Sequence, residues 1–422
     1  MQHFDTSRFA LPQDVLFILD TLHSAGYEAY IVGGCVRDMI LCELHNTSKP
    51  PNDYDIATSA LPDDVMRLFP YSIPTGAKYG TISVIMQSHS YEITTFRLDG
   101  TYSDARKPDS VRFTTSISED IKRRDFSMNA LAYAPHIGLV DEVGGVEDII
   151  NKRIVCVGEA KVRFSEDSLR ILRALRFSAT LGFSIESHTQ EAIHMNAPLL
   201  CSVARERVRL ELDKLLSGMY AESVLSAFLS IIRIVVPQLP TQCDFRVFKA
   251  LRDTTQYVRW VCFLYPCKTY AREILESLKF DNKSKEHILT LLWHYDMPLC
   301  VGEVELRHIV VNLGGRERAQ SILEDIARIK EAHIKVGIQK ADTQNLKTFH
   351  HIVQNVLGQS IPLSLKELCI NGEDLKHIGI KEGKQIGAIL AYLLNQVLED
   401  KLPHTRRDLL QAARNKLQEF KV

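Results

Sequence analysis

The fold is decided by the stretch Pro51-Asn52-Asp53-Tyr54-Asp55-Ile56-Ala57-Thr58, in which two aspartates alternate with side chains that turn toward a core. In an extended strand, residues two apart point to the same face, so Asp53 and Asp55 present their carboxylates side by side. Carboxylate oxygens are the hard ligands that Mg²⁺ prefers. Together with the upstream run Gly33-Gly34-Cys35-Val36-Arg37-Asp38, the pair indicates a metal-dependent nucleotide-transfer site.

The glycines directly follow an apolar run, Ala29-Tyr30-Ile31-Val32, and precede a helical run that contains Arg37. Glycine has no Cβ, so backbone N–H groups at such a helix start are accessible to a triphosphate. We therefore expect Gly33, Gly34 and Arg37 to bind phosphates. Taken alone, a Gly-Gly pair is also typical of a plain strand-to-helix turn. The aspartate pair downstream favours the phosphate-binding interpretation.

A third carboxylate is expected on a neighbouring strand. In Tyr91-Glu92-Ile93-Thr94-Thr95-Phe96-Arg97, alternation places Glu92 on one face with Thr94. Nucleotidyl transfer needs metal ions that bridge the attacking and leaving oxygens, with carboxylates fixing the ions. We expect Asp53, Asp55 and Glu92 to be catalytic, with Asp53 and Asp55 as the ligands of two Mg²⁺ ions. A solvent-facing strand glutamate is the alternative for Glu92.

Two adjacent cations precede a carboxylate in Arg123-Arg124-Asp125-Phe126, at the expected start of a helix. Guanidinium groups suit phosphate, and a carboxylate suits ribose hydroxyls. We therefore expect Arg124 and Asp125 to bind the nucleotide. A surface salt-bridge cluster is the alternative.

Base selection is expected from the run Glu166-Asp167-Ser168-Leu169-Arg170, interpreted as a helix on which Asp167 and Arg170 share a face. Cytosine and adenine both offer an amino donor beside a ring-nitrogen acceptor, which fits a carboxylate and a guanidinium. Guanine and uracil place a carbonyl against the carboxylate and would be rejected. Arg173 and Arg176 follow on the same helix and are also expected to bind the nucleotide. On spacing alone, a helix-surface ion pair between Glu166 and Arg170 is the better explanation of the run.

The composition is that of a globular protein. The chain has 422 residues, of which 45% are hydrophobic, enough for about two to four domains. It contains no long apolar run and no basic segment followed by an apolar one at its start, so we expect a cytoplasmic protein without a membrane partner. The nine cysteines form no CxxC pair, which favours ordinary thiols over disulfides or zinc.

The net charge of −1 conceals a local excess of basic residues near the C-terminus. The cations there are Lys401, Arg406, Arg407, Arg414, Lys416 and Lys421. They face only Asp408 and Glu419. We expect a basic patch in this part of the chain.

Strand-like runs alternate with short helices up to about residue 150, and long amphipathic helical segments follow. The expected strands are Tyr27–Val32, Tyr54–Ala57, Thr81–Met86, Tyr91–Phe96 and Val111–Thr114. The expected domains are a catalytic head over residues 1–150, a neck with the base-selecting helix over 151–217, a helical body over 218–340 and a helical tail over 341–422.

Five motifs occur in order and carry a resemblance to a known family. They are Gly33-Gly34-Cys35-Val36-Arg37-Asp38, Asp53-Tyr54-Asp55, Arg123-Arg124-Asp125-Phe126, Glu166-Asp167-Ser168-Leu169-Arg170 and Glu206-Arg207-Val208-Arg209-Leu210-Glu211. The set resembles the bacterial tRNA nucleotidyltransferase and poly(A) polymerase family. The resemblance implies an α+β protein, in which a head with a five-stranded mixed sheet is followed by an all-α neck, body and tail that grip the tRNA acceptor arm.

The resemblance also implies an activity, which is template-independent addition of CCA to tRNA 3′ ends from CTP and ATP, with Mg²⁺ as cofactor and pyrophosphate as product. Pro74–Thr81 looks like the tRNA-directed members of the family, and Asp99–Pro108 looks like the flexible loop of members that add the terminal A. Addition of A alone, poly(A) synthesis, and RNA binding on an inactive scaffold remain alternatives, as do a monomer and a dimer.

The segment Ile370–Leu375, with Gly379, Gly383 and Gly387, resembles the tail of the family. Turn glycines and helix starts there would meet RNA phosphates. Ordinary helix-capping glycines are the alternative.

Overall fold

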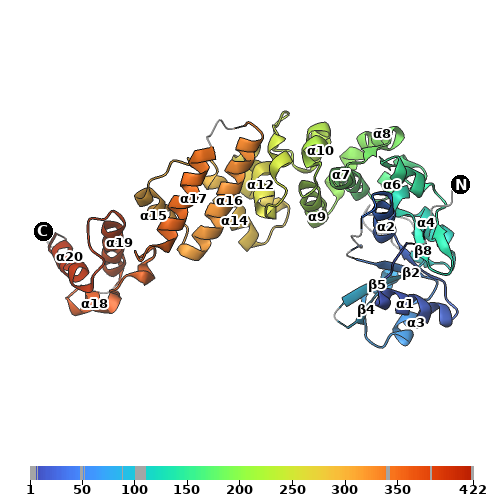
Figure 1. Cartoon of the computed structure of the whole chain (residues 1–422), viewed down its shortest axis with the longest axis horizontal. Coiled ribbons are helices and arrows are strands. Elements are labelled where there is room, and N and C mark those ends of the chain that lie inside the picture. The colour runs from blue at the N-terminus through green and yellow to red at the C-terminus, as the bar shows by residue number, and fades with distance from the viewer. Residues whose placement is uncertain are drawn as a thin grey trace. The chain divides into compact units, whose positions relative to one another are not determined.

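The structure is a computed structural model that describes residues 6, 8–47, 51, 53–87, 89–99, 111–338, 343–380 and 383–419. The chain forms two compact units. The first comprises Met1–Cys243 with Ser277–Lys279, and the second comprises Asp244–Glu276 with Phe280–Val422. All described strands lie in the first unit, and the described part of the second is built from helices and their connections (Figure 1). The expected α+β class is therefore confirmed, while the division into head, neck, body and tail stays a prediction.

The first unit is built on one mixed sheet whose strands lie in the order β3-β4-β5-β2-β1-β8-β9. β2 and β5 are parallel, and the other neighbouring pairs are antiparallel. The strands are β1 (Ala29–Val32), β2 (Asp55–Thr58), β3 (Ser72–Gly76), β4 (Thr81–Met86), β5 (His89–Thr95), β8 (Ala132–Ala134) and β9 (Gly138–Val140).

The sheet has seven strands, so the predicted number of five is wrong. The sequence pattern does not predict β3, because the strand contains Pro74 and its central side chains are exposed. A proline in a strand argues against a central position in the sheet, and β3 is an edge strand. β8 and β9 have three residues each, too few for a period-two pattern. The predicted strand Val111–Thr114 corresponds to β7 (Val111–Phe113), which pairs with β6 (Arg97–Asp99) in a separate two-stranded sheet.

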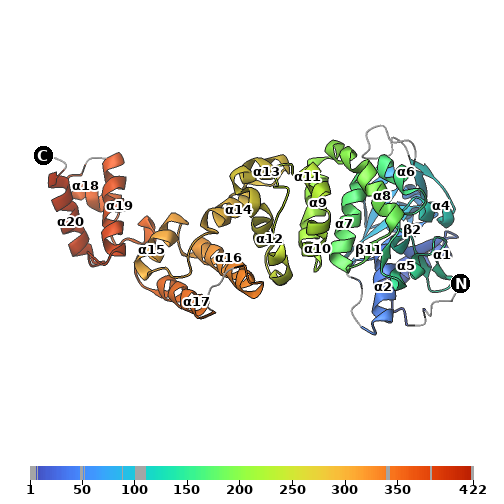
Figure 2. The same cartoon turned by 90° about the horizontal axis from the view of Figure 1, so that it is seen from above.

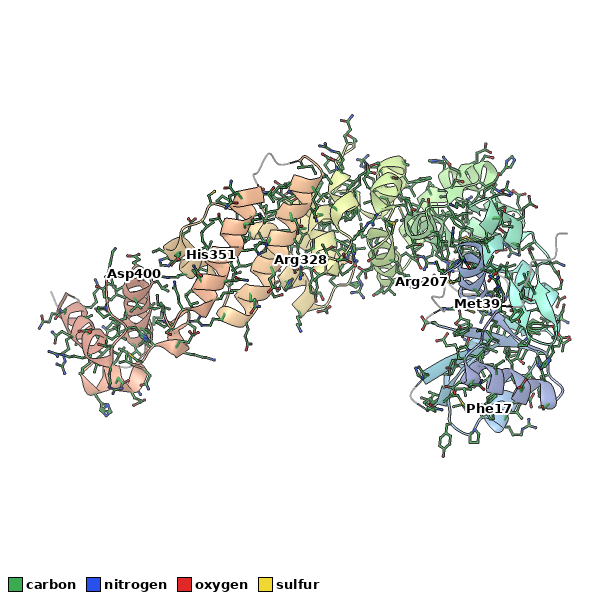
Figure 3. The ribbon with its side chains drawn as sticks, in the orientation of Figure 1. Phe17, Met39, Arg207, Arg328, His351 and Asp400 are labelled. Atoms are coloured by element: carbon green, nitrogen blue, oxygen red, sulfur yellow. The ribbon has the colours of Figure 1, made fainter. Side chains whose placement is uncertain are left out.

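Helices cover one side of the main sheet. α1 (Gln13–Ser24) packs on β1, and α3 (Pro62–Leu68) packs on β3, β4 and β5 (Figure 1). The buried residues of α1 recur at three and four spacing, which turns one apolar stripe toward the sheet. Phe17, marked in Figure 3, lies off this stripe and is 55% exposed.

Helices α7 and α9 pack against each other in the first unit. α7 (Leu169–Leu181) packs against α9 (Arg205–Leu216) and α10 (Ala221–Ala227), and Figures 1 and 2 both show the three side by side. Gly218 permits this approach, because a Cβ there would lie 2.4 Å from the carbonyl oxygen of Ala179. The other helices and 3₁₀ turns of this unit are α2 (Gly34–Leu44), η1 (Ala77–Tyr79), α4 (Ile117–Lys122), η2 (Ser127–Asn129), α5 (Gly145–Ile150), α6 (Ala160–Glu166), α8 (Ser187–Asn196), η3 (Ala197–Ser202) and α11 (Leu229–Val235).

Beyond Val157, nearly all the described elements are helices, as the sequence predicts. Within the described residues of this part, the exception is β11 (Ser184–Ile185), which pairs in parallel with β10 (Arg153–Ile154). The second unit contains η4 (Arg246–Ala250), α12 (Gln256–Leu264), η5 (Tyr265–Tyr270), α13 (Ala271–Ser277), α14 (Asn282–His294), α15 (Glu303–Asn312), α16 (Arg316–Lys335), α17 (Thr343–Gly358), η6 (Leu365–Glu367), α18 (Gly372–His377), α19 (Lys384–Leu398) and α20 (Arg406–Glu419). None of the helices that the structure describes combines the length and apolar character that crossing a bilayer requires.

Candidate active site

A cavity of about 640 Å³ opens in the first unit between the sheet and helix α7. It brings together most of the predicted site residues, although they come from segments far apart in the sequence. Those that line it are Asp55, Glu92, Arg124, Asp125, Asp167, Arg170 and Arg173. Gly33, Gly34, Arg37, Asp53 and Arg176 are described but lie outside the lining.

The acidic wall of the cavity is formed by adjacent strands. β2 and β5 pair in parallel with Ile56 opposite Ile93, so Asp55 and Glu92 are lateral neighbours on one face. The carboxyl of Asp55 opens to the cavity but is surrounded by enough protein that burial raises its pKa above the usual range. The negative charge of Asp53 raises this pKa further, whereas Arg124 opposes the shift. Asp53 and Asp55 are thus close enough to repel each other.

These carboxylates suit a divalent cation in two respects. Their oxygens are hard ligands, and a cation between them would relieve the repulsion that raises the pKa of Asp55. Within the described ranges, however, no group of three or more His, Cys, Asp or Glu side chains is gathered closely enough to hold a metal ion. Asp53 and Asp55 therefore fit the cation as a pair, and the role of Glu92 as a third carboxylate stays a prediction.

The basic wall of the cavity is formed by Arg123 and Arg124, which are held in place by one buried aspartate in α4. Asp120 accepts hydrogen bonds from Arg123 (2.6 Å from Nη2) and from Arg124 (3.1 Å from Nη2). It also accepts one from the backbone N–H of Arg97, at 3.2 Å. Burial by itself raises the pKa of Asp120, but the two guanidinium charges outweigh it and hold the pKa below its usual range. Asp120 therefore stays ionised and holds Arg123 and Arg124 at the cavity.

Gly33 allows Arg124 to reach the end of β1. Its φ of 80° lies in the left-handed region that favours glycine, and a Cβ there would stand 3.2 Å from Nη1 of Arg124. The N–H of Gly33 donates to the carbonyl of Leu131 at 3.1 Å, so it is already bonded within the protein. What Gly33 contributes at this position is the space that its missing side chain leaves.

Arg37 lies behind the cavity, in the packed layer between α2 and α7. It is only 8% exposed and donates to Asn129 at 2.6 Å and to Asp38 at 2.8 Å. Its guanidinium also lies 5.4 Å from the centre of the Phe177 ring. In this arrangement Arg37 ties α2 to the segment that carries Asn129 and to α7.

Asp125 and Arg173 join the sheet layer to α7. Oδ2 of Asp125 accepts from Nε of Arg173 at 2.7 Å, and Oδ1 accepts from the backbone N–H of Phe126 at 2.9 Å. Burial alone would raise the pKa of Asp125, but the charge and hydrogen bonds of Arg173 hold it below the usual range. Arg176 lies deeper, 3.3 Å from Glu211 and 3.9 Å from the centre of the Phe177 ring, and burial lowers its pKa to about 10.

The expectation that Asp167 and Arg170 share one helix is wrong. α6 ends at Glu166 and α7 begins at Leu169, and Asp167 is extended between them, with φ −139° and ψ 98°. Its side chain accepts from the backbone N–H of Leu169 at 3.1 Å, which competes with a continuous helix. Both residues nevertheless line the cavity. Arg170 also pairs with Glu166 at 3.0 Å, as its four-residue spacing suggested.

The partner of Asp167 comes from another helix and was missed by the sequence analysis. Arg207 on α9, marked in Figure 3, donates to Oδ2 of Asp167 at 2.8 Å and also lines the cavity. Glu211, one turn further on α9, faces Arg173 and Arg176. The signal was present in Glu206–Glu211, because residues four apart share a helix face. What the sequence does not show is that this face meets α7.

Three family models match the chain. The Poly A polymerase head domain matches residues 29–155, the probable RNA and SrmB-binding site of polymerase A matches residues 182–230, and the putative tRNA nucleotidyltransferase domain 2 matches residues 251–413. Together they cover the segments that line the cavity on the sheet side and much of the helical part.

Individual proteins are similar over half or more of this chain. The CCA-adding enzyme of Leuconostoc citreum (strain KM20) is 35% identical over 96% of this chain and 97% of its own length. The CCA-adding enzyme of Geobacillus thermodenitrificans (strain NG80-2) is 50% identical over about half of each chain. Among solved structures, the Bacillus stearothermophilus CCA-adding enzyme in complex with CTP superposes with a TM-score of 0.80 at 31% identity, over 97% of this chain and 99% of that one.

Proposed function

The chain belongs to the family of CCA-adding enzymes, and we propose that it adds C, C and A in turn to the 3′ end of tRNA from CTP and ATP, without a nucleic-acid template. The observation that supports the proposal is that one cavity is lined both by carboxylates, those of Asp55 and Glu92, and by guanidinium groups, those of Arg123, Arg124 and Arg173. This separation of charge suits a reaction that brings a triphosphate to a hydroxyl.

The basic wall would bind the triphosphate. Arg123 and Arg124 are held by Asp120, so their guanidinium groups are oriented before the nucleotide arrives. Preorientation of this kind avoids reorganisation when charge shifts from the α-phosphate to the leaving pyrophosphate. Asp125 is kept ionised and fixed by Arg173, and it would accept hydrogen bonds from the ribose hydroxyls.

The acidic wall would position the acceptor. Asp53 and Asp55 would hold divalent cations, for which we propose Mg²⁺. Bound there, the ions would supply Lewis-acid chemistry, lowering the pKa of the attacking 3′ hydroxyl and neutralising the triphosphate. The protein itself contributes Asp55 as the first residue of β2, with Asp53 two residues before it in the chain, and Glu92 as the lateral neighbour of Asp55 on β5.

Asp167 and Arg170 would select the base. A carboxylate has about four lone-pair sites, so Asp167 accepts from Arg207 and Leu169 and still has capacity for a base amino group. The guanidinium of Arg170 would donate to the ring nitrogen. Cytosine and adenine satisfy both groups, whereas guanine and uracil would place a carbonyl against the carboxylate. Arg207 orients Asp167 and is a positioning residue in this scheme.

The test is to supply purified protein and Mg²⁺ with tRNA transcripts ending at the discriminator base, at C and at CC, and to resolve the products at single-nucleotide resolution. Three additions that then stop support the proposal. A added only to the CC-ended transcript would mean an A-adding enzyme, and long A tails would mean a poly(A) polymerase. No addition would favour RNA binding on an inactive scaffold.

The segment Asp99–Pro108, which bears on addition of the terminal A, falls almost wholly outside the described residues. The transcript assay therefore decides between full CCA addition and A addition. The cytoplasmic location and the monomeric or dimeric state stay predictions.

A further inference from the structure

One face of the main sheet continues outward from the catalytic carboxylates. On β4 and β5 the residues of one face, Ile82, Val84 and Ile93, are buried, while α3 packs against these strands. The opposite face carries Thr81, Ser83 and Ile85 on β4, and Ser90, Glu92 and Thr94 on β5. Because Thr81, Glu92 and Thr94 line the cavity, this second face is an extension of the floor of the candidate active site.

The strand register makes a straight row across this face. Asp55 on β2 neighbours Glu92 on β5, Glu92 pairs with Ser83 on β4, and Ser83 pairs with Ile73 on β3. The row crosses three strand spacings, so Ile73 lies roughly 14 Å from Asp55. Thr75 lies on the same face, because its hydroxyl is 2.8 Å from that of Ser83, and the register of β3 against β4 shifts between Ile73 and Gly76.

The far end of the row is apolar and exposed. Tyr71 lies opposite Ile85, and the backbone N–H of Ile85 donates to the carbonyl of Tyr71 at 2.8 Å. Tyr71, Ile73 and Ile85, here called the outer strip, are 78%, 49% and 39% exposed. Adjacent apolar side chains that remain exposed beside a site are typical of an interaction surface. Their neighbours on this face, Thr75 and Ser83, are uncharged.

We propose that the outer strip is the surface on which the bases just before the 3′ end of the RNA acceptor stack, with Tyr71 as the stacking side chain. This inference rests on the proposed function. Phosphates are bound by cations, which the strip lacks, whereas bases bind to aromatic and apolar side chains. In a CC-ended acceptor the discriminator base lies two nucleotides before the reacting 3′ end, and two stacked steps at ~3.4 Å each span only about 7 Å. Bases that are unstacked from one another, as in recognised single-stranded RNA ends, extend further and reach across the roughly 14 Å between Asp55 and the strip, which places the discriminator base there.

A second copy of the chain is a less suitable occupant. β3 is the edge strand of the sheet, and pairing with another edge needs backbone N–H donors in register. Pro74, in the middle of β3, has no N–H. The outer strip is therefore poorly built for sheet extension between copies, but continuous with the site that must receive RNA.

The experiment uses the full-length protein and a CC-ended tRNA transcript that carries 2-aminopurine at the discriminator position. The double variant Tyr71→Ala/Ile73→Ser is compared with wild type, with Tyr71→Phe, and with Ile137→Ser. Ile137 is a matched control, because it is 51% exposed and lies between β8 and β9 at the opposite edge of the sheet. The readouts are KM for the transcript, KM for ATP, and the fluorescence change of 2-aminopurine on binding.

The double variant is expected to raise KM for the transcript roughly 10-fold and to lose the fluorescence change, with KM for ATP unchanged. Tyr71→Phe, which keeps the ring, and Ile137→Ser should behave as wild type. Equal KM and fluorescence in wild type and double variant would overturn the inference. So would dissociation of a dimer, detected by sedimentation, without a change in KM for the transcript.

Failure of the proposed function gives a different pattern. If wild type adds no nucleotide, the function is wrong. The fluorescence change, measured by binding alone, would then still report whether the outer strip contacts the RNA.

Discussion

Asp55 is the residue at which the electrostatics of the site concentrate. It stands at the start of β2, beside Asp53 in the chain and Glu92 on the neighbouring strand, and it faces Arg124. Burial and the charge of Asp53 raise the pKa of Asp55, which means that its ionised carboxylate is destabilised when nothing neutralises it. A bound cation removes this cost, so the charge of Asp55 is expected to matter more than its shape.

Asp55→Asn keeps the shape and removes the charge. We expect it to reduce nucleotide addition by at least about 1000-fold while affinity for tRNA stays within about twofold, because the carboxylate acts on the reacting groups. Single-turnover extension of a CC-ended transcript measures the first quantity, and filter binding measures the second. Asp63→Asn, at an exposed aspartate of α3, is the matched control. Undiminished extension by Asp55→Asn would remove the metal assignment.

Arg207 offers a second test at the level of one side chain. Its guanidinium donates to both oxygens of Asp167, at 2.8 and 3.4 Å. Lysine keeps the charge but not the two-pronged geometry. We expect Arg207→Lys to lower the preference for CTP and ATP over UTP and GTP by roughly 10-fold, measured as ratios of kcat/KM. Arg209→Lys on the same helix should leave the ratios unchanged. If the two variants discriminate equally, Arg207 does not orient Asp167.

At the scale of elements, the decisive packing is that of α7 against α9 and against the sheet layer. α7 contributes Arg170, Arg173 and Arg176, and each pairs with a carboxylate from a different segment. Glu166 precedes α7, Asp125 follows α4, and Glu211 lies on α9. Buried charges of this kind are costly unless paired, so the pairs fix how the elements meet.

The pair of Asp125 and Arg173 predicts a pH dependence of stability. Because the pKa of Asp125 is lowered in the folded state, its stabilisation is fully present above the ordinary value of 3.8 and is lost as pH falls through the lowered pKa. Asp125→Asn is therefore expected to cost about 3–5 kcal/mol of unfolding free energy at neutral pH, and progressively less below about pH 4.

Urea denaturation at a series of pH values measures this difference. Asp244→Asn is the control, because Asp244 forms an exposed pair with Arg246 and its loss should cost less than about 1 kcal/mol. A cost for Asp125→Asn that does not fade in acid would show that its carboxylate charge is not the stabilising feature.

At the scale of the whole molecule, charge is distributed unevenly. The net charge is −1, yet α20 presents exposed arginines at positions 407 and 414, seven residues and therefore about two turns apart on one face. Such a face suits RNA phosphates spaced along a backbone. The expected basic patch stays a prediction that rests on these two arginines, because Lys401 pairs with Glu399, Arg406 pairs with Asp374, and Lys421 lies outside the described residues.

Removing these cations should change the salt dependence of RNA binding. We expect Arg407→Ala/Arg414→Ala to weaken tRNA binding and to reduce the slope of log affinity against log salt by roughly 0.7–0.9 for each arginine, with KM for CTP unchanged. Binding titrations at several salt concentrations measure the slope. Lys347→Ala on α17 is the control at another exposed cation. An unchanged slope in the double variant would mean that α20 does not contact the phosphates.

Local patterns in the sequence predict which chemical groups make up the candidate site. The spacing of Asp53 and Asp55 predicts two neighbouring carboxylates, although Asp53 precedes β2, which begins at Asp55. Gly33 lies at a backbone position with positive φ. Motif order then identified the family and the α+β class. The carboxylate spacing and the glycine turn are local features, because they depend on residues within a few positions of one another, whereas the order of the motifs extends over residues 33–211.

Which charged side chains pair with one another depends on the tertiary structure. The pairing of Asp167 with Arg207, of Asp125 with Arg173, and of Glu211 with Arg176 joins residues that are 35 or more positions apart. Short edge strands such as β3 and β9 form because neighbours supply their hydrogen bonds, not because their own sequences demand it. The row from Asp55 to Ile73 likewise follows from strand register, which is set by packing of the whole sheet and cannot be read from any one segment.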